Sequence, residues 1–171
     1  MIVIREEIKG DRADIFTVHN KAFAGDGEAR LVDALRTAHA SELSLVAEFD
    51  GNLCGHILFS AVTLEVNSLN KKVLGLAPLA VLPSNQNQGV GALLTRSALE
   101  RCANLGYDAV VVLGSSAYYP RCGFGPAADF GLISEYPVAP EHFMAFELQP
   151  HGLEGCGGLT RYHHLVNELD I

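Results

Sequence analysis

Residues 79–98 read Leu-Ala-Val-Leu-Pro-Ser-Asn-Gln-Asn-Gln-Gly-Val-Gly-Ala-Leu-Leu-Thr-Arg-Ser-Ala, and this stretch decides the fold. An apolar segment passes through a Gln-x-x-Gly-x-Gly turn into a sequence with helical periodicity. The first turn of a helix has backbone N–H groups without intrahelical partners, and the helix dipole adds partial positive charge there. Gly89 and Gly91 lack a Cβ, so a ligand can approach the backbone closely. The stretch predicts a phosphate site at residues 88–92.

A tight turn without any ligand explains the same pair of glycines, so the turn alone leaves both interpretations open. Two phosphate motifs are excluded. A P-loop requires Gly-Lys-Ser or Gly-Lys-Thr where this chain has Gly91-Ala92-Leu93. A dinucleotide fingerprint requires a third glycine where Leu94 or Thr95 stands. A phosphate bound here therefore belongs to another kind of ligand.

Two motifs in order give the chain a family resemblance. Gln86-Asn87-Gln88-Gly89-Val90-Gly91 resembles the Gln/Arg-x-x-Gly-x-Gly/Ala signature of the GNAT N-acetyltransferase superfamily, which holds the pyrophosphate of acetyl-coenzyme A. Tyr119-Pro120-Arg121-Cys122-Gly123-Phe124 resembles the Tyr-x-x-x-Gly-Phe segment on the fourth helix of that fold. A helix and the apolar segment 109–113 separate the two motifs, so together they are far more specific than either alone.

Further segments resemble one branch, the YhbS-like group of bacterial predicted acetyltransferases. They are Ser44-Leu45-Val46-Ala47-Glu48, Gly55-His56-Ile57-Leu58-Phe59-Ser60, Leu76-Ala77-Pro78-Leu79-Ala80-Val81, Val112-Leu113-Gly114 and Tyr118-Tyr119-Pro120-Arg121. The resemblance runs from the first helix to about Leu148. It implies one GNAT domain over residues 1–171 with an α+β fold in α/β/α layers. The implied central sheet is mixed, with about six to seven strands, and the pyrophosphate-binding helix follows strand 4.

Composition agrees with one acidic globular domain. The 171 residues suffice for a single sizeable core, and no apolar run approaches the length of a membrane span. Residues 1–7 lack the basic and apolar regions of a secretory signal, so we expect a cytoplasmic protein. The net charge of −8 argues against nucleic acid and favours a cationic amine substrate. The four cysteines form no Cys-x-x-Cys pair, and we expect no metal.

Periodicity places the secondary structure along the chain. Alternating and apolar segments predict strands over 2–6, 43–49, 53–66, 72–82, 109–113 and 141–149. Helical spacing predicts helices over 11–23, 27–39 and from Val90 to Leu105, with Gly106 ending the last one. Asp50-Gly51 favours a tight hairpin. The run 110–113 has the character of a strand buried on both faces, so strand, helix and strand form a parallel crossover. Residues 162–169 stay unassigned.

The resemblance also implies roles for individual residues. Tyr119 is the general acid, since a phenol with a pKa of about 10 is protonated at neutral pH and can donate to the departing thiolate. The spacing to Gly123 selects Tyr119 over Tyr118, although a tyrosine here without the motif is simply a packing residue. The implied contacts to acetyl-CoA are Leu79, Ala80, Val81, Gln86, Asn87, Gln88, Gly89, Val90, Gly91, Ala92 and Tyr119. Of these, residues 79–81 offer backbone groups to the pantetheine arm, and one N–H polarises the acetyl carbonyl. An ordinary edge strand bounded by prolines explains residues 79–81 nearly as well.

The general base is less clear from the sequence. Many family members carry a carboxylate on the fourth or fifth strand, but neither 73–82 nor 109–113 contains Asp, Glu or His. Glu28, in the helical region that forms the acceptor wall in the family, is the predicted base, and His56 is a second candidate. Ser115 and Ser116 are candidates for binding the acceptor or the thiol. A substrate amine with a low pKa needs no protein base at all.

Other function classes fit the sequence less well. The segment Leu113-Gly114-Ser115-Ser116-Ala117 lacks the Gly-x-Ser-x-Gly of a serine hydrolase. Cys122 needs no reactivity to occupy its place in the motif, and adjacent His163 and His164 diverge too much for a metal site. The serious alternative is a non-catalytic acyl-CoA-binding sensor or regulatory module. The acceptor stays open among polyamines, aminoglycosides, amino acids, peptide N-termini and protein lysines, and the protein is expected to be a monomer or homodimer.

Overall fold

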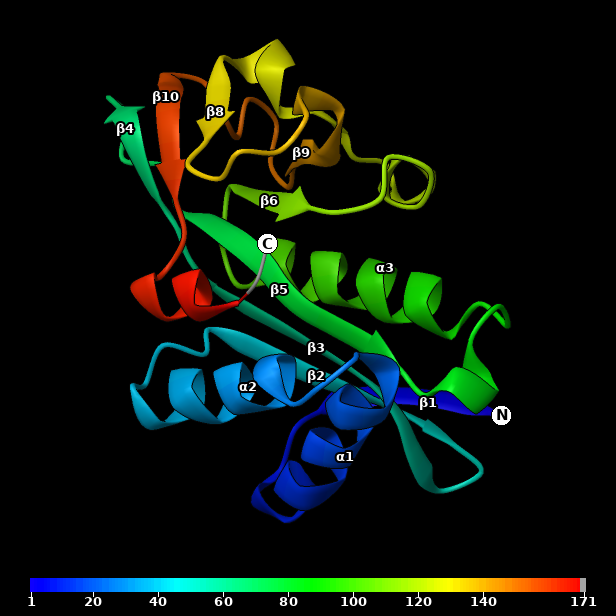
Figure 1. Ribbon diagram of the computed structural model, residues 1–171. Helices are drawn as coiled ribbons and strands as arrows, with labels where there is room; N and C mark the ends of the chain where they lie inside the picture. The colour runs from blue at the N-terminus through cyan, green and yellow to red at the C-terminus, as the bar shows by residue number, and fades with distance from the viewer. Residues whose placement is uncertain (170–171) are drawn as a thin grey trace.

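The centre of the molecule is a seven-stranded mixed sheet with the strand order β1-β2-β3-β5-β6-β9-β7 (Figure 1). The computed structural model describes residues 1–169. Strands β5 and β6 are parallel and the other neighbours are antiparallel. The predicted α+β fold with a mixed sheet is confirmed. The strand bounds are β1 (Ile2–Glu6), β2 (Leu43–Phe49), β3 (Asn52–Ala61), β5 (Val73–Val81), β6 (Ala109–Leu113), β7 (Gly125–Pro126) and β9 (Phe143–Glu147).

Three helices cover the two faces of this sheet. Alternate strand residues point to opposite faces, so Leu45 packs in one cluster with α3 (Val90–Asn104) and Val46 in another with α1 (Arg12–Ala22) and α2 (Gly27–Thr37). Leu94 and Ala98 form part of the α3 core and are fully buried. The helical spacing therefore marked part of the buried face of α3, whereas Leu93 and Leu105, which share that spacing, are exposed. None of the helices among residues 1–169 is long and apolar enough to span a bilayer.

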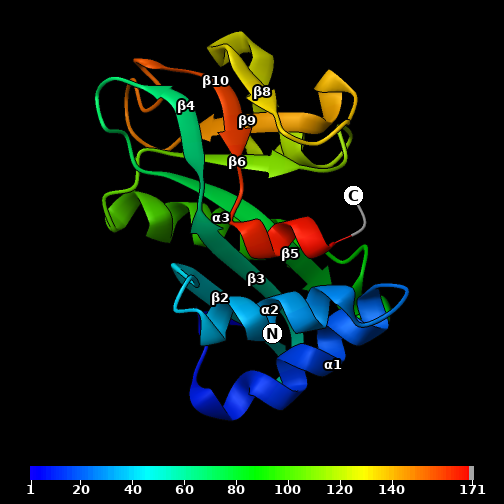
Figure 2. The same ribbon diagram turned by 60° about the vertical axis from the view of Figure 1, so that its left-hand side comes forward.

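A second, three-stranded sheet has the order β4-β10-β8, with β4 (Thr63–Asn67), β8 (Leu132–Ser134) and β10 (Cys156–Arg161). Figure 2 shows β4 and β10 side by side, close to the end of the main sheet that contains β6 and β9. The prediction of a single strand over 53–66 was wrong, because β3 ends before Val62 and β4 begins after it. The backbone N–H of Val62 donates to the Val73 carbonyl. The helix α3 follows β5. Because β4 belongs to the second sheet, β5 is the fifth strand along the chain but the fourth strand of the main sheet. Strand β10 contains two glycines and shows no alternation of apolar and polar side chains, so the sequence analysis did not predict this strand.

Strands β5 and β6 separate along their length (Figure 1). Their parallel register runs only from Val73↔Ala109 to Leu76↔Val112, whereas β5 continues to Val81. Beyond Leu76, β5 keeps β3 as its neighbour and has no described partner on the β6 side. Peptide groups of residues 77–81 are therefore available on that side to a ligand lying along the strand.

The segment expected as a fourth helix is one 3-10 turn, η3 (Tyr119–Cys122). Pro120 occupies its start, and Gly123 ends it with a φ of 98°, a left-handed conformation that suits glycine. The unassigned C-terminal segment forms the short 3-10 helix η6 (His164–Glu168), which packs near α2. Both short helices contribute to one pocket, η3 through Tyr119 and η6 through Val166.

Candidate functional site

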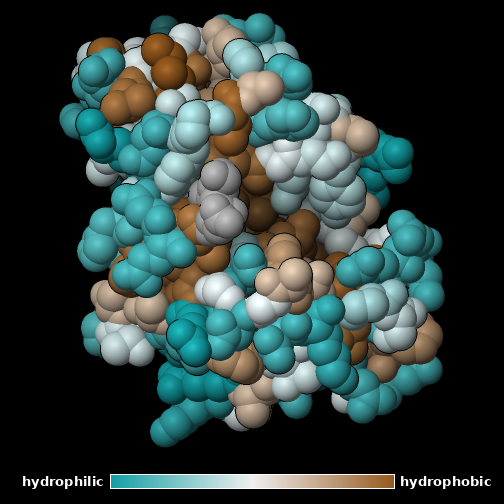
Figure 3. All heavy atoms as spheres, viewed as in Figure 1, coloured by the Kyte–Doolittle hydropathy of each residue, from teal (hydrophilic) through white to brown (hydrophobic). Residues whose placement is uncertain are grey.

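Two pockets meet where β5 and β6 separate. Leu79 of β5 lines both of them. We name the pocket beside residues 85–92 the turn pocket and the one beside Glu28 and Tyr119 the inner pocket. Figure 3 shows a hollow on this face of the molecule with hydrophobic residues at its floor. A ligand lying along the free side of β5 would therefore reach from one pocket to the other.

The turn pocket contains most of the predicted cofactor residues. Its volume is about 650 Å³, which suits a small-molecule ligand. The predicted residues that line it are Leu79, Val81, Gln86, Asn87, Gly89, Val90, Gly91 and Ala92. Three others lie outside this lining: the Ala80 side chain alternates into the core, Gln88 is exposed beside the pocket, and Tyr119 lines the inner pocket.

The start of α3 forms one wall of the turn pocket. Gly89 is the N-cap with a φ of 83°, and no side chain caps the helix. The first backbone N–H groups of α3 are therefore left for an external acceptor, and the helix dipole adds positive potential there. The Gln86 side-chain amide donates to the Val81 carbonyl at 2.9 Å, and that of Gln88 donates to the Ser84 carbonyl at 3.2 Å. These two side chains hold the shape of the turn.

Five residues that line the turn pocket were absent from the predicted cofactor contacts: Asn85, Arg96, Tyr118, Arg121 and Cys122. The Tyr118 hydroxyl is buried and has no hydrogen-bond partner among the described residues, since the Thr95 hydroxyl donates to the Gly91 carbonyl instead. A Cβ built on Gly91 would lie 2.7 Å from the Tyr118 oxygen. The two arginines could have been predicted, because arginine side chains commonly bind the phosphates of a ligand.

The inner pocket brings together the two predicted catalytic residues. Glu28, half-buried at the start of α2, and Tyr119 of η3 both line it. Its volume is about 260 Å³. The remaining lining residues are Phe23, Leu76, Ala77, Pro78, Leu79, Leu113, Tyr162, Val166 and Leu169. The described part of this wall is mainly apolar, and Glu28 is the one charged residue in it.

Tyr119 is held firmly in this wall. Its side chain is 8% exposed, and its ring packs edge-on against Tyr118 and Phe124, with ring centroids 4.9 and 5.6 Å away. A Cβ on Gly114 would lie 2.5 Å from the Tyr119 ring, so only glycine leaves room for the ring there. Burial raises the pKa of Tyr119 above its usual value, and the proximity of Tyr118 adds to the rise. The phenol is therefore protonated at neutral pH and can act only as a donor of that proton.

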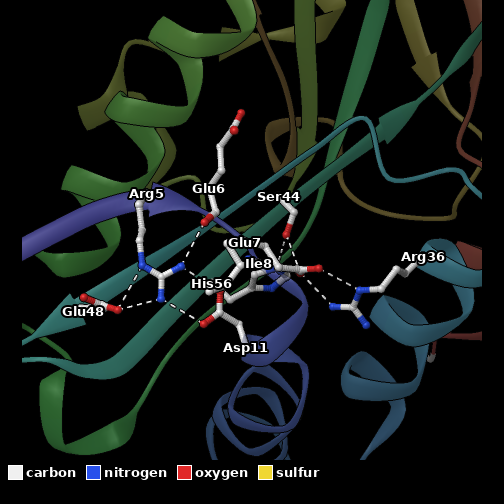
Figure 4. A network of polar contacts seen from close by, with 9 residues as sticks. All are labelled: Arg5, Glu6, Glu7, Ile8, Asp11, Arg36, Ser44, Glu48 and His56. Carbon is white, nitrogen blue, oxygen red and sulfur yellow. Dashed lines mark hydrogen bonds and ion pairs between the residues drawn. The ribbon is translucent and has the colours of Figure 1, made fainter.

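His56, the second candidate base, lies outside both pockets. It is fully buried in β3, and both ring nitrogens are engaged. Figure 4 shows its contact with Ser44. The Ser44 hydroxyl donates to Glu7 at 2.8 Å, so it accepts from His56 Nε2 at 2.7 Å. His56 Nδ1 then accepts from His19 Nε2, also at 2.7 Å. His56 is a core histidine within a hydrogen-bonded chain, and the sequence alone could not show this because its partners come from distant segments.

This buried chain makes the protein sensitive to acid. Burial lowers the pKa of His19 to about 4 and, aided by its neighbour Arg36, lowers the pKa of His56 well below its usual value. Between pH 4 and an ordinary histidine pKa of about 6.5, the unfolded chain binds more protons than the folded one. For His19, the free energy of unfolding should therefore fall by about 1.4 kcal/mol per pH unit as pH drops through that range. Urea unfolding at several pH values measures this. His19→Gln keeps a hydrogen-bond donor and removes the titration, so an unchanged slope in that variant would contradict the assignment.

The other candidate residues, Ser115, Ser116, His163 and His164, line neither pocket. Ser115 and Ser116 are exposed, and Ser115 Oγ accepts from the Ala117 backbone N–H. The expectation that the side chains of His163 and His164 diverge was wrong, because their rings stack with 4.4 Å between the centroids. Among residues 1–169, no group of three or more His, Cys, Asp or Glu side chains is arranged to hold a metal ion.

The sequence and the structure match known acetyltransferases. Residues 12–124 match the profile described as "Acetyltransferase (GNAT) family". The uncharacterized N-acetyltransferase YjhQ of Escherichia coli K12 is 40% identical over 144 residues, which are 82% of this chain and 80% of YjhQ. The crystal structure of E. coli YhbS in complex with CoA is similar with a TM-score of 0.93 and 35% identity, covering 99% of this chain and 94% of that chain. A Brucella melitensis GNAT acetyltransferase in complex with acetyl-CoA has a TM-score of 0.79 and 33% identity, covering 97% and 98%.

Proposed function

Because the chain belongs to the acetyltransferase (GNAT) family, we propose that it transfers an acetyl group from acetyl-CoA to a primary amine, with residues 1–171 acting as one domain. The observation that carries the proposal is the meeting of the turn pocket and the inner pocket at Leu79. One pocket offers an uncapped helix start and two arginines, and the other offers a carboxylate and a phenol. This division of groups suits a long anionic donor and a separate amine.

Acetyl-CoA binding is supported by the chemistry of the turn pocket. The uncapped N–H groups of α3 would bind the pyrophosphate, and Arg96 and Arg121 would add charge-assisted contacts to the phosphates. The backbone of residues 77–81 would pair with the amides of the pantetheine arm. The relatives crystallised with CoA and with acetyl-CoA support the same ligand here.

We propose direct attack of the amine on the thioester while both substrates are bound. Glu28 takes a proton from the amine, through water where the distance requires it, and the freed nitrogen lone pair attacks the acetyl carbon. A backbone N–H of β5 beyond Leu76 polarises the carbonyl oxygen. Tyr119 donates its phenolic proton to the sulfur as the carbon–sulfur bond breaks. The products are the N-acetylated amine and free coenzyme A.

Release of the thiol separates this enzyme from the alternative of a non-catalytic acyl-CoA-binding module. Acetyl-CoA is incubated with the protein and a panel of primary amines, and the free thiol is measured with a chromogenic disulfide. An enzyme releases thiol in an amine-dependent way, whereas binding measured by calorimetry with no release under any amine favours the module. We further propose a cytoplasmic location. We also propose that the protein has no nucleic-acid partner, because its net charge of −8 disfavours binding to a polyanion.

Gly91→Ala should weaken acetyl-CoA binding on the order of tenfold. The helical backbone itself accepts alanine, but the new methyl group would lie 2.7 Å from the Tyr118 hydroxyl and push that ring into the turn pocket. Removing the oxygen removes the clash. Calorimetry should therefore find that Gly91→Ala with Tyr118→Phe binds acetyl-CoA more tightly than Gly91→Ala alone. Equal affinity in the single and double variants would show that Tyr118 does not transmit the effect.

A further inference from the structure

We propose that the acceptor is a small primary amine with one positive charge and a compact apolar body, and that Tyr162 is a specificity residue that hydrogen-bonds it. The proposal rests on the proposed function and names the substrate class of the inner pocket. Its basis is the chemistry of the pocket wall, the size of the pocket and one buried hydroxyl.

Among the described residues, the inner pocket wall carries one charge. Glu28 is the one charged side chain among the residues of the range 1–169 that line it. A single ammonium finds a counter-charge there, whereas the described wall offers the further ammonium groups of a polyamine no second carboxylate. The carboxylate of a free amino acid would find no cation among the same lining residues. Both classes therefore carry a desolvation cost that a monoamine avoids.

Size and apolar surface point the same way. The pocket holds about 260 Å³, below the range of about 300–1,000 Å³ usual for drug-sized ligands. Most of its wall consists of aliphatic or aromatic side chains, including Phe23, Leu76, Leu113 and Val166. An apolar body of a few carbons or one ring gains by leaving water for such a wall. A folded protein surface or a sugar with many hydroxyls gains no such stabilisation from an apolar wall.

Tyr162 supplies the polar contact. It follows β10, its side chain is 6% exposed, and its hydroxyl is buried without a hydrogen-bond partner among the described residues. Burial raises the pKa of Tyr162, and the neighbouring Tyr119, Tyr136 and Glu135 add to the rise. A Cβ on Gly75 would lie 2.5 Å from the Tyr162 ring, so that glycine fixes the ring against β5. A buried unpaired hydroxyl is costly, and a polar atom of a ligand in the pocket would satisfy it.

The segment that carries this residue lies beyond the part of the chain that matches the family profile. Tyr162, Val166 and Leu169 line the pocket from the C-terminal side, whereas the profile ends at residue 124. We infer that the family core supplies donor binding and acid–base groups, and the C-terminal segment selects the acceptor.

An amine panel tests the substrate class. The probes are 2-phenylethylamine and isoamylamine against spermidine, glycine and a lysine-containing peptide, each with saturating acetyl-CoA. We expect kcat/KM for the best apolar monoamine to exceed that of each polar probe by about tenfold or more, which corresponds to about 1.4 kcal/mol. A higher kcat/KM for spermidine, glycine or the peptide would overturn this inference and leave the proposed function intact. Absence of thiol release with every probe, together with intact acetyl-CoA binding, would overturn the proposed function itself.

Tyr162→Phe tests the specificity residue. It should raise the KM for the preferred amine about 3- to 10-fold, with kcat and the Kd for acetyl-CoA unchanged. Because it removes an unpaired buried hydroxyl, it should also keep or raise the Tm of the free protein. Tyr136→Phe is the matched control, since the Tyr136 hydroxyl donates to Asn167 and its ring lies 6.1 Å from that of Tyr162. The control should lower the Tm and leave the amine KM unchanged. A lower Tm with an unchanged amine KM in Tyr162→Phe would show a purely structural role.

Discussion

Tyr119→Phe is expected to lower kcat by about 10²–10⁴-fold, the usual loss when a general acid is removed. The substitution keeps the ring that packs against Phe124 and beside Gly114, and it removes only the proton donor. Folding and the Kd for acetyl-CoA should therefore stay near the wild-type values. Steady-state kinetics with an active amine and calorimetry with acetyl-CoA measure the two quantities separately.

Tyr118→Phe is the matched control for this prediction. Tyr118 lines the turn pocket and Tyr119 the inner pocket, so the two variants should have different effects. Tyr118→Phe should alter the Kd for acetyl-CoA and keep most of kcat. Full activity in Tyr119→Phe together with an inactive Tyr118→Phe would reverse the assignment. If both variants keep full kcat, solvent protonates the thiolate and neither tyrosine is the acid.

Glu28→Gln is expected to lower kcat/KM for the amine by about 10²-fold or more at neutral pH. The amide has nearly the same shape but cannot accept the proton, and the substitution also removes the negative charge that Glu28 contributes to the inner pocket wall. The loss should shrink as pH rises, because a growing fraction of the amine is then already neutral. A pH profile of kcat/KM measures this trend.

Glu100→Gln provides the control for Glu28→Gln. Glu100 is exposed on α3 and does not line the inner pocket, so its variant should follow the wild-type pH profile. A Glu28→Gln variant whose kcat/KM equals that of Glu100→Gln across the pH range would exclude Glu28 as the base. The amine would then have to reach the pocket already neutral.

Much of the fold was predictable because its determinants are local. The periodicity of residues 90–104 depends on side chains three and four positions apart, and the structure has α3 there. The apolar run at 109–113 is β6, buried as predicted. The strand predicted over 53–66 was wrong at Val62, because its alternation continues while the chain leaves one sheet for another. Choice of partner strand is a long-range property that a local pattern does not record.

The inner pocket was only partly predictable for the same reason. The motif Tyr-x-x-x-Gly-Phe pointed to Tyr119, and the resemblance pointed to Glu28. Nothing in the local sequence pointed to Tyr162, which reaches the pocket through the second sheet, or separated a buried His56 from a catalytic one. Burial and hydrogen-bond partners arise from segments far apart in the chain.

The sequence alone was enough to predict the strand, turn and helix at residues 79–98 and to supply the two motifs that indicate the acetyltransferase family, because each depends on residues within a few positions of one another. Only the tertiary structure decided that β5 separates from β6 after Leu76, that Tyr118 and Tyr119 enter different pockets, and that Glu28, Tyr119 and Tyr162 line one small apolar pocket. Those residues come from three distant segments, and they meet only because the strand order and the packing of α2 and η6 bring the segments together.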